Sequence, residues 1–135
     1  MKHVVVGILY KVVDDQKLYL LMSSTRDFGQ FTGMLYPVGG HIEDGETVEK
    51  ALEREVYEEL AIKIEPVNEI HTSMGDVPDQ TTHWWLCKPL PSDTQFDLDT
   101  NEVKEVQWLT KDQIVASPHL IWPATYKFFT EIFFV

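Results

Sequence analysis

The amino-acid sequence predicts an α/β fold in which a mixed β-sheet is covered by helices on both faces. Segments rich in valine, isoleucine, leucine and tyrosine flank one strongly helical segment near the middle of the chain. A second segment with helical spacing lies towards the C-terminus. Strands that flank one helix and precede another bury apolar side chains on both faces of the sheet. A length of 135 residues, 44% of them hydrophobic, suits one domain, so we expect residues 1–135 to form a single unit.

The N-terminal part is predicted to begin with a β-hairpin. Residues 3–10 and 17–23 have strand composition, and the polar residues Asp-Asp-Gln at 14–16 supply the turn between them. Residues 24–34 contain two glycines and several small polar residues, so we predict a loop. The pair Gly39-Gly40 then allows the backbone to turn sharply and to approach a ligand or metal closely.

The central helix is predicted to start after Thr47 and to end near Ile62. Thr47 is a suitable N-cap, and Glu49 suits the positive end of the helix dipole. At the predicted end stands Ala61, where a left-handed conformation costs alanine about 1 kcal/mol more than glycine. The buried stripe has an apolar residue at every fourth position: Val48, Leu52, Val56 and Leu60.

The chain beyond the central helix is predicted to form three more strands and two helices. Glycine, proline and two aspartates at 75–79 supply a turn between the first two of these strands. From Pro123 onward, aromatic and aliphatic residues fall at helical spacing and predict a terminal helix with one aromatic face. The expected elements are strands at 64–74 and 81–88, a loop at 89–101, a strand at 103–108 and a short helix from 110.

Composition limits the partners of the protein. Eleven basic and 22 acidic residues give a formal charge of −11, which argues against binding a nucleic-acid polymer through its phosphates. A small phosphorylated ligand is compatible, because a bound metal ion changes the local sign of the field. Cys87 is the only cysteine, and no apolar run is long enough to span a bilayer. We therefore expect a cytoplasmic protein without membrane contact, either a monomer or a homodimer.

The residues that indicate chemistry are concentrated in the central helix. Glu55, Glu58 and Glu59 are three or four positions apart, so their carboxylates crowd one patch of the helix surface. Like charges at this spacing cost an isolated helix about 0.2–0.5 kcal/mol per pair. A hard divalent cation such as Mg²⁺ takes oxygen ligands and removes this repulsion. The patch therefore predicts a metal-dependent enzyme that acts on phosphate compounds.

Residues 40–62 resemble the Nudix box, G-x5-E-x7-R-E-U-x-E-E-x-G-U, in which U is an aliphatic residue. Gly40, Glu46 and the run from Arg54 to Ile62 match this pattern everywhere except at Ala61, where the family usually has glycine. The resemblance implies the Nudix fold, an α/β/α sandwich with a mixed β-sheet. The strand order predicted around this segment is compatible with the whole family domain.

The resemblance also implies a reaction, the metal-dependent hydrolysis of the diphosphate linkage in a nucleoside diphosphate derivative. Mg²⁺ or Mn²⁺ would be held by Glu55, Glu58, Glu59 and the main-chain carbonyl of Gly39. The small size of the chain is similar to that of the MutT-type nucleoside triphosphate pyrophosphohydrolases. ADP-ribose or a nucleotide sugar is the alternative substrate class, because Pro78 lies at a distance from the box similar to that in ADP-ribose-cleaving relatives. A nucleotide sensor without catalysis is the alternative from another class.

The resemblance implies further catalytic roles. The base that activates water is either Glu55 or a loop glutamate, Glu102 or Glu105. Glu58 completes the acidic set. Arg54 is expected to fix a box carboxylate by a charge-assisted hydrogen bond rather than to touch the substrate.

The remaining candidates surround this acidic set. Gly40 and Glu46 are expected to orient the groups that hold the metal. Arg26, in the loop before the box, is a candidate phosphate contact, with a solvated side chain as the alternative. The candidates for stacking on a nucleobase, each with core packing as the alternative, are Tyr36, Trp84 and Trp122.

Overall fold

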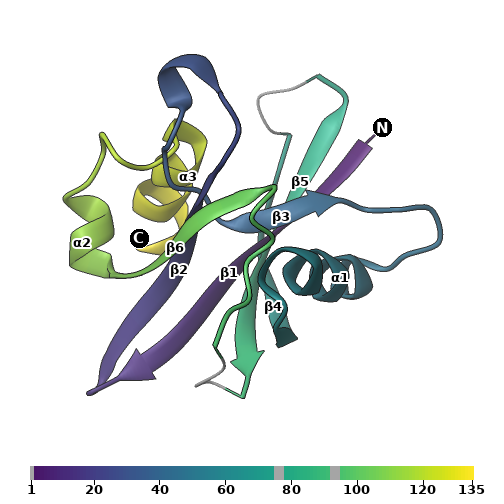
Figure 1. Ribbon diagram of the computed structural model, residues 1–135, viewed down its shortest axis with the longest axis horizontal. Helices are drawn as coiled ribbons and strands as arrows, with labels where there is room; N and C mark the ends of the chain where they lie inside the picture. The colour runs from purple at the N-terminus through teal and green to yellow at the C-terminus, as the bar shows by residue number, and fades with distance from the viewer. Residues whose placement is uncertain (1, 75–77, 92–94) are drawn as a thin grey trace.

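The computed structural model describes residues 2–74, 78–91 and 95–135 (Figure 1). The five predicted strands and the central helix appear in the predicted order, and one further strand, β3, precedes the helix. A short turn of 3₁₀ helix lies at Gly29–Phe31, and a π-helical turn at Phe129–Phe133. The remaining elements are β1 Lys2–Val13, β2 Gln16–Ser24, β3 Val38–His41, α1 Val48–Leu60, β4 Lys63–Ser73, β5 Gln80–Leu90, β6 Val103–Thr110, α2 Lys111–Val115 and α3 Pro123–Phe128.

The strands form one mixed sheet, as predicted, in the order β4-β5-β1-β2-β6. Strand β1 is its central member and changes partners along its length. The first part, from Lys2 to Leu9, runs parallel to β5, and β3 pairs antiparallel with the same part of β1. The last part, from Tyr10 to Val13, pairs antiparallel with β2. The other described pairs, β2 with β6 and β4 with β5, are antiparallel.

Helices cover both faces of this sheet, which confirms the predicted α/β/α arrangement (Figure 1). Helix α1 packs on one face, where Leu52, Val56 and Leu60 of the predicted stripe are fully buried. Helices α2 and α3 and the π-helical turn pack on the other face, around Ile114 and Phe128. None of the helices within the described ranges is both long and apolar enough to cross a membrane.

The hairpin of β1 and β2 is longer than predicted, and its turn is tight. Asp14 and Asp15 both have positive φ, 51° and 63°, while Val13 and Gln16 already pair across the two strands. A two-residue loop with both residues in the left-handed region matches the twist of the flanking strands. Aspartate tolerates this conformation better than most residues do, which explains the polar pair.

The prediction of a sharp turn at Gly39 and Gly40 is wrong, because both residues lie in β3 and pair with β1. The glycines are required by close approach instead. A side chain added at Gly39 would overlap the backbone carbonyl of Val5, and one at Gly40 would overlap the carboxylate of Glu55. Strand β3 therefore packs closely against both β1 and the face of α1 that carries Glu55.

Two further predictions need correction. Strand β5 continues through Pro89, which pairs with Ile64, so the predicted loop begins later. The terminal α-helix ends at Phe128 and continues as the π-helical turn, in which the Phe134 amide donates to the Phe129 carbonyl at 2.9 Å. The wider turn lets neighbouring aromatic rings pack on one another. Residues 75–77 and 92–94, parts of the predicted turn and loop, lie outside the described residues.

Helix α1 ends on Ala61, whose φ of 57° and ψ of 34° are left-handed. Its amide donates to the carbonyl of Tyr57, as expected for this type of helix end. We predict that Ala61→Gly raises the free energy of unfolding by about 1 kcal/mol, because glycine adopts this conformation without a steric penalty. Chemical denaturation with unchanged m-value would measure the gain.

Ala116→Gly is the matched control for this prediction. Ala116 is also an exposed residue that ends a helix, but its φ of −80° and ψ of 0° are right-handed. Glycine gains nothing there and adds conformational entropy to the unfolded chain, so this variant is expected to be slightly less stable than the wild type. Equal changes in both variants would contradict strain at Ala61.

Candidate active site

Helix α1 begins as the sequence predicts, and its start positions the acidic residues. The side chain of Thr47 accepts a hydrogen bond from the Lys50 amide at 3.2 Å, which confirms Thr47 as the N-cap. In the preceding loop, Glu46 Oε1 accepts from the Glu43 amide at 2.9 Å. The Glu46 carboxylate is thereby held beside the first turns of the helix.

Arg54 ties this loop, strand β3 and helix α1 together. Its Nε and Nη2 donate to the two carboxylate oxygens of Glu46 at 2.8 and 3.0 Å. Its Nη2 also donates to the His41 carbonyl at 2.9 Å, and its Nη1 donates to Glu55 Oε1 at 3.0 Å. Glu58 completes the set with Oε2 at 3.3 Å from Nη1. Arg54 therefore holds the carboxylates of Glu46, Glu55 and Glu58 in place.

These contacts have an electrostatic consequence for Glu46. The hydrogen bonds from Arg54, with a further one from the Glu43 amide, lower the pKa of Glu46 to about 2. Glu46 is thus held in its charged form as the partner of Arg54. Glu55 differs, because burial raises its pKa and the contacts with Arg54 only oppose that effect.

Glu55, Glu58 and Glu59, with Asp99 and Glu102 nearby, form an acidic cluster. Within it, Glu59 has the fewest positive or hydrogen-bonding partners in the described part of the chain. Burial raises its pKa to about 8, and the nearby carboxylates of Glu55, Glu102, Glu58 and Asp99 add to the effect. Its Oε2 is buried and has no hydrogen-bond partner among the described residues. A buried carboxylate oxygen without a donor is costly unless a cation or a proton joins it.

The donor atoms of these residues are of the type that a hard divalent cation binds. Several carboxylates surround Glu59, and carboxylate oxygens are the ligands that Mg²⁺ prefers. Within residues 2–74, 78–91 and 95–135, however, no three histidine, cysteine, aspartate or glutamate side chains converge closely enough to hold an ion as they stand. Arg54 draws the carboxylates of Glu55 and Glu58 towards itself.

On the side of the acidic cluster away from Arg54, the fold brings together residues that are distant in sequence. Arg26 Nη2 donates to Glu102 Oε1 at 2.7 Å, so the end of β2 faces the segment before β6. Tyr36 lies beside them, where burial raises its pKa and the charges of Glu59 and Glu102 add to the effect. Arg26, Tyr36 and Glu102 therefore lie close to the cluster. The Glu105 side chain instead accepts a hydrogen bond from Gln107 within β6.

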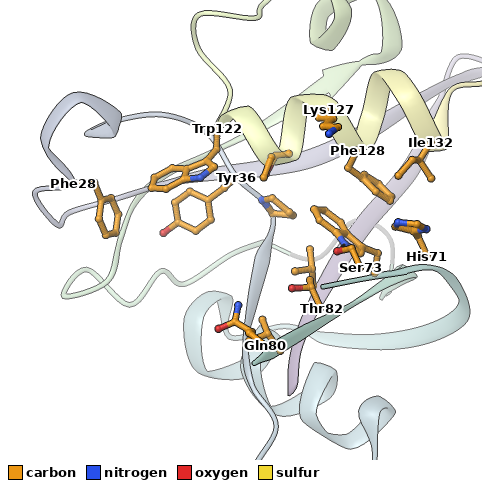
Figure 2. A pocket seen from close by; sticks show the side chains of 16 residues that line it. Phe28, Tyr36, His71, Ser73, Gln80, Thr82, Trp122, Lys127, Phe128 and Ile132 are labelled. Atoms are coloured by element: carbon orange, nitrogen blue, oxygen red, sulfur yellow. Dashed lines mark hydrogen bonds between the residues drawn. The ribbon is translucent and has the colours of Figure 1, made fainter. Parts of the chain in front are cut away.

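A cavity of about 780 Å³ lies between the sheet and α3 (Figure 2). Tyr36 and Phe28 lie at one end, and the ring of Trp122 lies 5.4 Å from Phe28 and 6.0 Å from Tyr36 between centroids. Polar side chains occur further along the cavity, at His71, Ser73, Gln80, Thr82 and Lys127. Such a volume, mostly apolar with a few polar groups, is typical of small-molecule sites.

The structure separates the three predicted stacking residues. Tyr36 and Trp122 are together at the end of the cavity near the acidic cluster. Trp84 lies in the cavity wall, where its ring stacks on Phe128 at 4.1 Å between centroids and its Nε1 donates to Ser73 Oγ at 3.1 Å. Trp84 is thus largely part of the hydrophobic core on the α3 side of the sheet.

Sequence reasoning missed several residues of this site. Phe28 and Phe31 both contact the ring of Trp122. Two aromatic residues in a loop that is otherwise small and polar are the signal that would have indicated them. Asp99 offered no such signal, because it lies in an irregular segment whose amides Asn101, Glu102 and Val103 bond back to it.

Comparison with known proteins identifies a family model and two relatives that match parts of this sequence. The family model described as NUDIX domain matches residues 1–132. The human NAD-capped RNA hydrolase NUDT12 is 32% identical over 83 residues, which are 62% of this chain and 18% of that protein. The nucleoside triphosphatase NudI of Enterobacter sp. is 40% identical over 58 residues, 43% of this chain and 41% of that protein. The chain thus aligns with less than half the length of either relative.

Solved structures show the same fold. A NUDIX-family hydrolase from Clostridium perfringens has a TM-score of 0.73 at 21% identity and covers 96% of this chain and 94% of its own. The E. coli ORF135 protein also has a TM-score of 0.73, at 21% identity, over 99% of this chain and 89% of that chain. At these identities the likeness concerns the fold alone.

Proposed function

Because the chain belongs to the Nudix family, we propose that it hydrolyses the diphosphate linkage of a nucleoside diphosphate derivative with the help of Mg²⁺ or Mn²⁺. The observation that carries this proposal is the buried, unpaired Oε2 of Glu59 inside a cluster of carboxylates. In a helix with only a structural role, a buried carboxylate oxygen without a hydrogen-bond donor would cost stability and bring no benefit. The single cysteine supports a cytoplasmic location, and the formal charge of −11 supports a small substrate rather than a nucleic-acid polymer.

Each acidic residue has a distinct part in the proposed reaction. Glu55, Glu58, Glu59 and the carbonyl of Gly39 would hold the ion, which when bound supplies Lewis-acid stabilisation of the phosphate oxygens. Arg54 keeps Glu55 in place through its hydrogen bond, and Glu46 in turn orients Arg54. Gly40 lets the backbone of β3 lie against the Glu55 carboxylate.

Two residues are candidates for the base that removes a proton from water. Glu55 is half-buried, and its raised pKa makes it a stronger base than an ordinary carboxylate. Glu102 reaches the cluster from the opposite side and interacts electrostatically with Glu59. The bell-shaped dependence of kcat/KM on pH distinguishes them, since its acidic limb disappears only when the base is replaced by glutamine.

The aromatic end of the cavity is the proposed site of the nucleobase. Trp122 and Tyr36 provide ring faces next to the acidic cluster, whereas Trp84 shapes the wall deeper inside. Arg26 would contact a phosphate. We propose a nucleoside triphosphate as the substrate, and the similarity to the nucleoside triphosphatase NudI supports it. ADP-ribose or a nucleotide sugar is the alternative substrate. Pro78, whose distance from the box suggests it, is an exposed turn residue just before β5, the strand that brings Gln80 into the cavity wall.

Incubation of the purified protein with a panel of nucleotides and Mg²⁺, followed by product analysis, tests the proposal. Pyrophosphate and a nucleoside monophosphate are expected from a triphosphate, whereas AMP and ribose phosphate would identify ADP-ribose as the substrate. Tight binding of a nucleotide without any product would instead support the nucleotide sensor. The absence of both binding and product across the panel would contradict the proposed substrate class.

We predict that Trp122→Leu raises the KM for the nucleotide about tenfold and changes kcat much less. One stacked base contributes about 1–3 kcal/mol, and this contact is made before and during the reaction alike. Steady-state kinetics with the best substrate of the panel measures the effect.

Trp108→Leu is the matched control for this substitution. Trp108 is also partly buried, but its ring packs on Phe96 and beneath the Lys11 ammonium, outside the cavity lining. This variant is expected to lose stability and to keep the wild-type KM. An equal rise in KM in both variants would exclude a specific role of Trp122 in base binding.

A further inference from the structure

The ion pair between Arg26 and Glu102 joins two chain segments at the edge of the acidic cluster. The side chains meet at 2.7 Å between Nη2 and Oε1. Two hydrogen bonds also join these segments. The Thr25 amide donates to the Glu102 carbonyl at 3.2 Å, and the Thr25 hydroxyl donates to the Asn101 carbonyl at 2.9 Å. The two segments therefore keep their places even when the ion pair opens.

The ion pair itself is easily exchanged. The side chain of Arg26 is 61% exposed and that of Glu102 is 40% exposed. A guanidinium has five N–H donors, and the structure shows one of those of Arg26 engaged with a described side chain. An exposed pair of this kind corresponds to at most about a fivefold change in an equilibrium constant, so an incoming phosphate can compete with Glu102.

Arg26 is well suited to receive that phosphate. The other guanidinium near the cluster, that of Arg54, is already shared among Glu46, Glu55 and the His41 carbonyl. Arg26 instead faces the side of the cluster where its charge interacts with Glu102, Tyr36 and Glu59. Tyr36 lines the cavity, so a phosphate chain that leaves a base in the cavity towards the cluster passes Arg26.

We propose that the Arg26–Glu102 ion pair is a latch that the substrate's phosphate opens. In the free protein Arg26 holds the Glu102 carboxylate aside. When a phosphate group of the nucleotide takes over the guanidinium, Glu102 is released to act at the cluster. Arg26 is therefore a positioning residue that couples substrate arrival to the availability of Glu102. This inference rests on the proposed function, since it assumes that a nucleotide phosphate enters the site.

A double-mutant cycle of Arg26→Gln and Glu102→Gln tests the latch. The dissociation constant of a methylene-bridged, non-hydrolysable nucleoside triphosphate is measured by tryptophan fluorescence in the presence of Mg²⁺. Arg26→Gln is expected to weaken binding about tenfold. Glu102→Gln is expected to strengthen binding up to about fivefold when Arg26 is present, because the competitor is removed, and to leave binding unchanged in the Arg26→Gln background.

Asp99→Asn is the control for the loss of negative charge alone. Asp99 also interacts electrostatically with Glu59, but its side chain accepts from the Asn101 amide and not from Arg26. Asparagine retains that acceptor. Its effect on binding is expected to be the same with and without Arg26, in contrast to the effect of Glu102→Gln.

Kinetics provide a second readout. If the latch operates, Glu102→Gln lowers kcat and KM together. Arg26→Gln raises KM but leaves kcat close to that of the wild type, because Glu102 is then always free, and Arg26→Lys lowers KM again because the charge returns. Equal effects of Glu102→Gln on binding in both backgrounds would overturn the proposal. The binding cycle needs no turnover, so a protein that binds nucleotides with the expected coupling but hydrolyses none would disprove the proposed function and leave the latch standing.

Discussion

Replacing Glu59 by glutamine is expected to lower kcat/KM at least about a hundredfold and, at the same time, to make the metal-free protein more stable. Activity falls because the group with the unpaired buried oxygen is lost. Stability rises because a buried charge surrounded by other carboxylates becomes a neutral amide. The expected gain in the free energy of unfolding is about 1–3 kcal/mol where Glu59 is charged.

The pH dependence of this gain follows from the pKa of Glu59. Unfolded, the carboxyl has its ordinary pKa of 4.5, whereas in the folded protein burial raises the pKa to about 8. Between these two values the folded protein keeps a proton that the unfolded chain has lost, so the wild type loses stability as the pH rises. Glu59→Gln does not have this loss. The stability difference between variant and wild type therefore grows across the window and is constant above it.

Urea denaturation of both proteins with EDTA, at several pH values across the window, measures the effect. Glu49→Gln is the control, because Glu49 is an exposed carboxylate in the first turn of the same helix. This variant is expected to keep full activity and to gain no stability. A Glu59→Gln protein that keeps its activity would contradict the role of Glu59 in the reaction, and one that is destabilised at every pH would contradict the cost of its buried charge.

The second large effect is expected from Arg54→Gln, which should destabilise the protein by about 2–4 kcal/mol and abolish most activity. The substitution leaves Glu46, Glu55 and Glu58 without their shared cation, and the His41 carbonyl without a donor. The carboxylates then repel one another, and Glu55 loses its orientation. Thermal unfolding and steady-state kinetics measure the two losses.

Lysine at this position and a second site on α1 separate the causes. Arg54→Lys restores the charge but not the fork that binds Glu46 through two nitrogens, so only part of the stability should return. Lys50→Gln makes the matching charge change at an exposed pair with Glu53, where the expected loss is below about 1 kcal/mol. Equal losses at positions 50 and 54 would contradict the central position of Arg54.

The sequence predicts the part of the site that lies on one helix. Spacing along α1 determines which side chains are neighbours, so the periodicity of the helix is enough to place Glu55, Glu58 and Glu59 together. The N-cap at Thr47 and the buried stripe follow from equally local rules. The same local reasoning misplaced Gly39 and Gly40, because only the pairing of β3 with β1 shows why they lack side chains.

The rest of the site depends on contacts between distant parts of the chain. The cavity takes residues from β1, β4, β5, α3 and the loop before β3, and its lining is a result of strand order, which no local pattern specifies. Trp84 and Trp122 have equal stacking potential in the sequence. Only the packing of Phe128 on Trp84 assigns one to the core and leaves the other near the acidic cluster.

The close fit around Gly39 and Gly40 has a consequence for how the chemistry arises during folding and how it can change in evolution. Glu55 receives its surroundings only when α1 docks on β3, and β3 can form only against β1. The surroundings of the Glu55 carboxylate therefore form only in molecules in which both of these long-range contacts are made. A side chain at position 39 would have to displace the backbone of β1, whereas one at position 40 would displace the Glu55 carboxylate, so changes at the first position act on the sheet and changes at the second act on the acidic cluster.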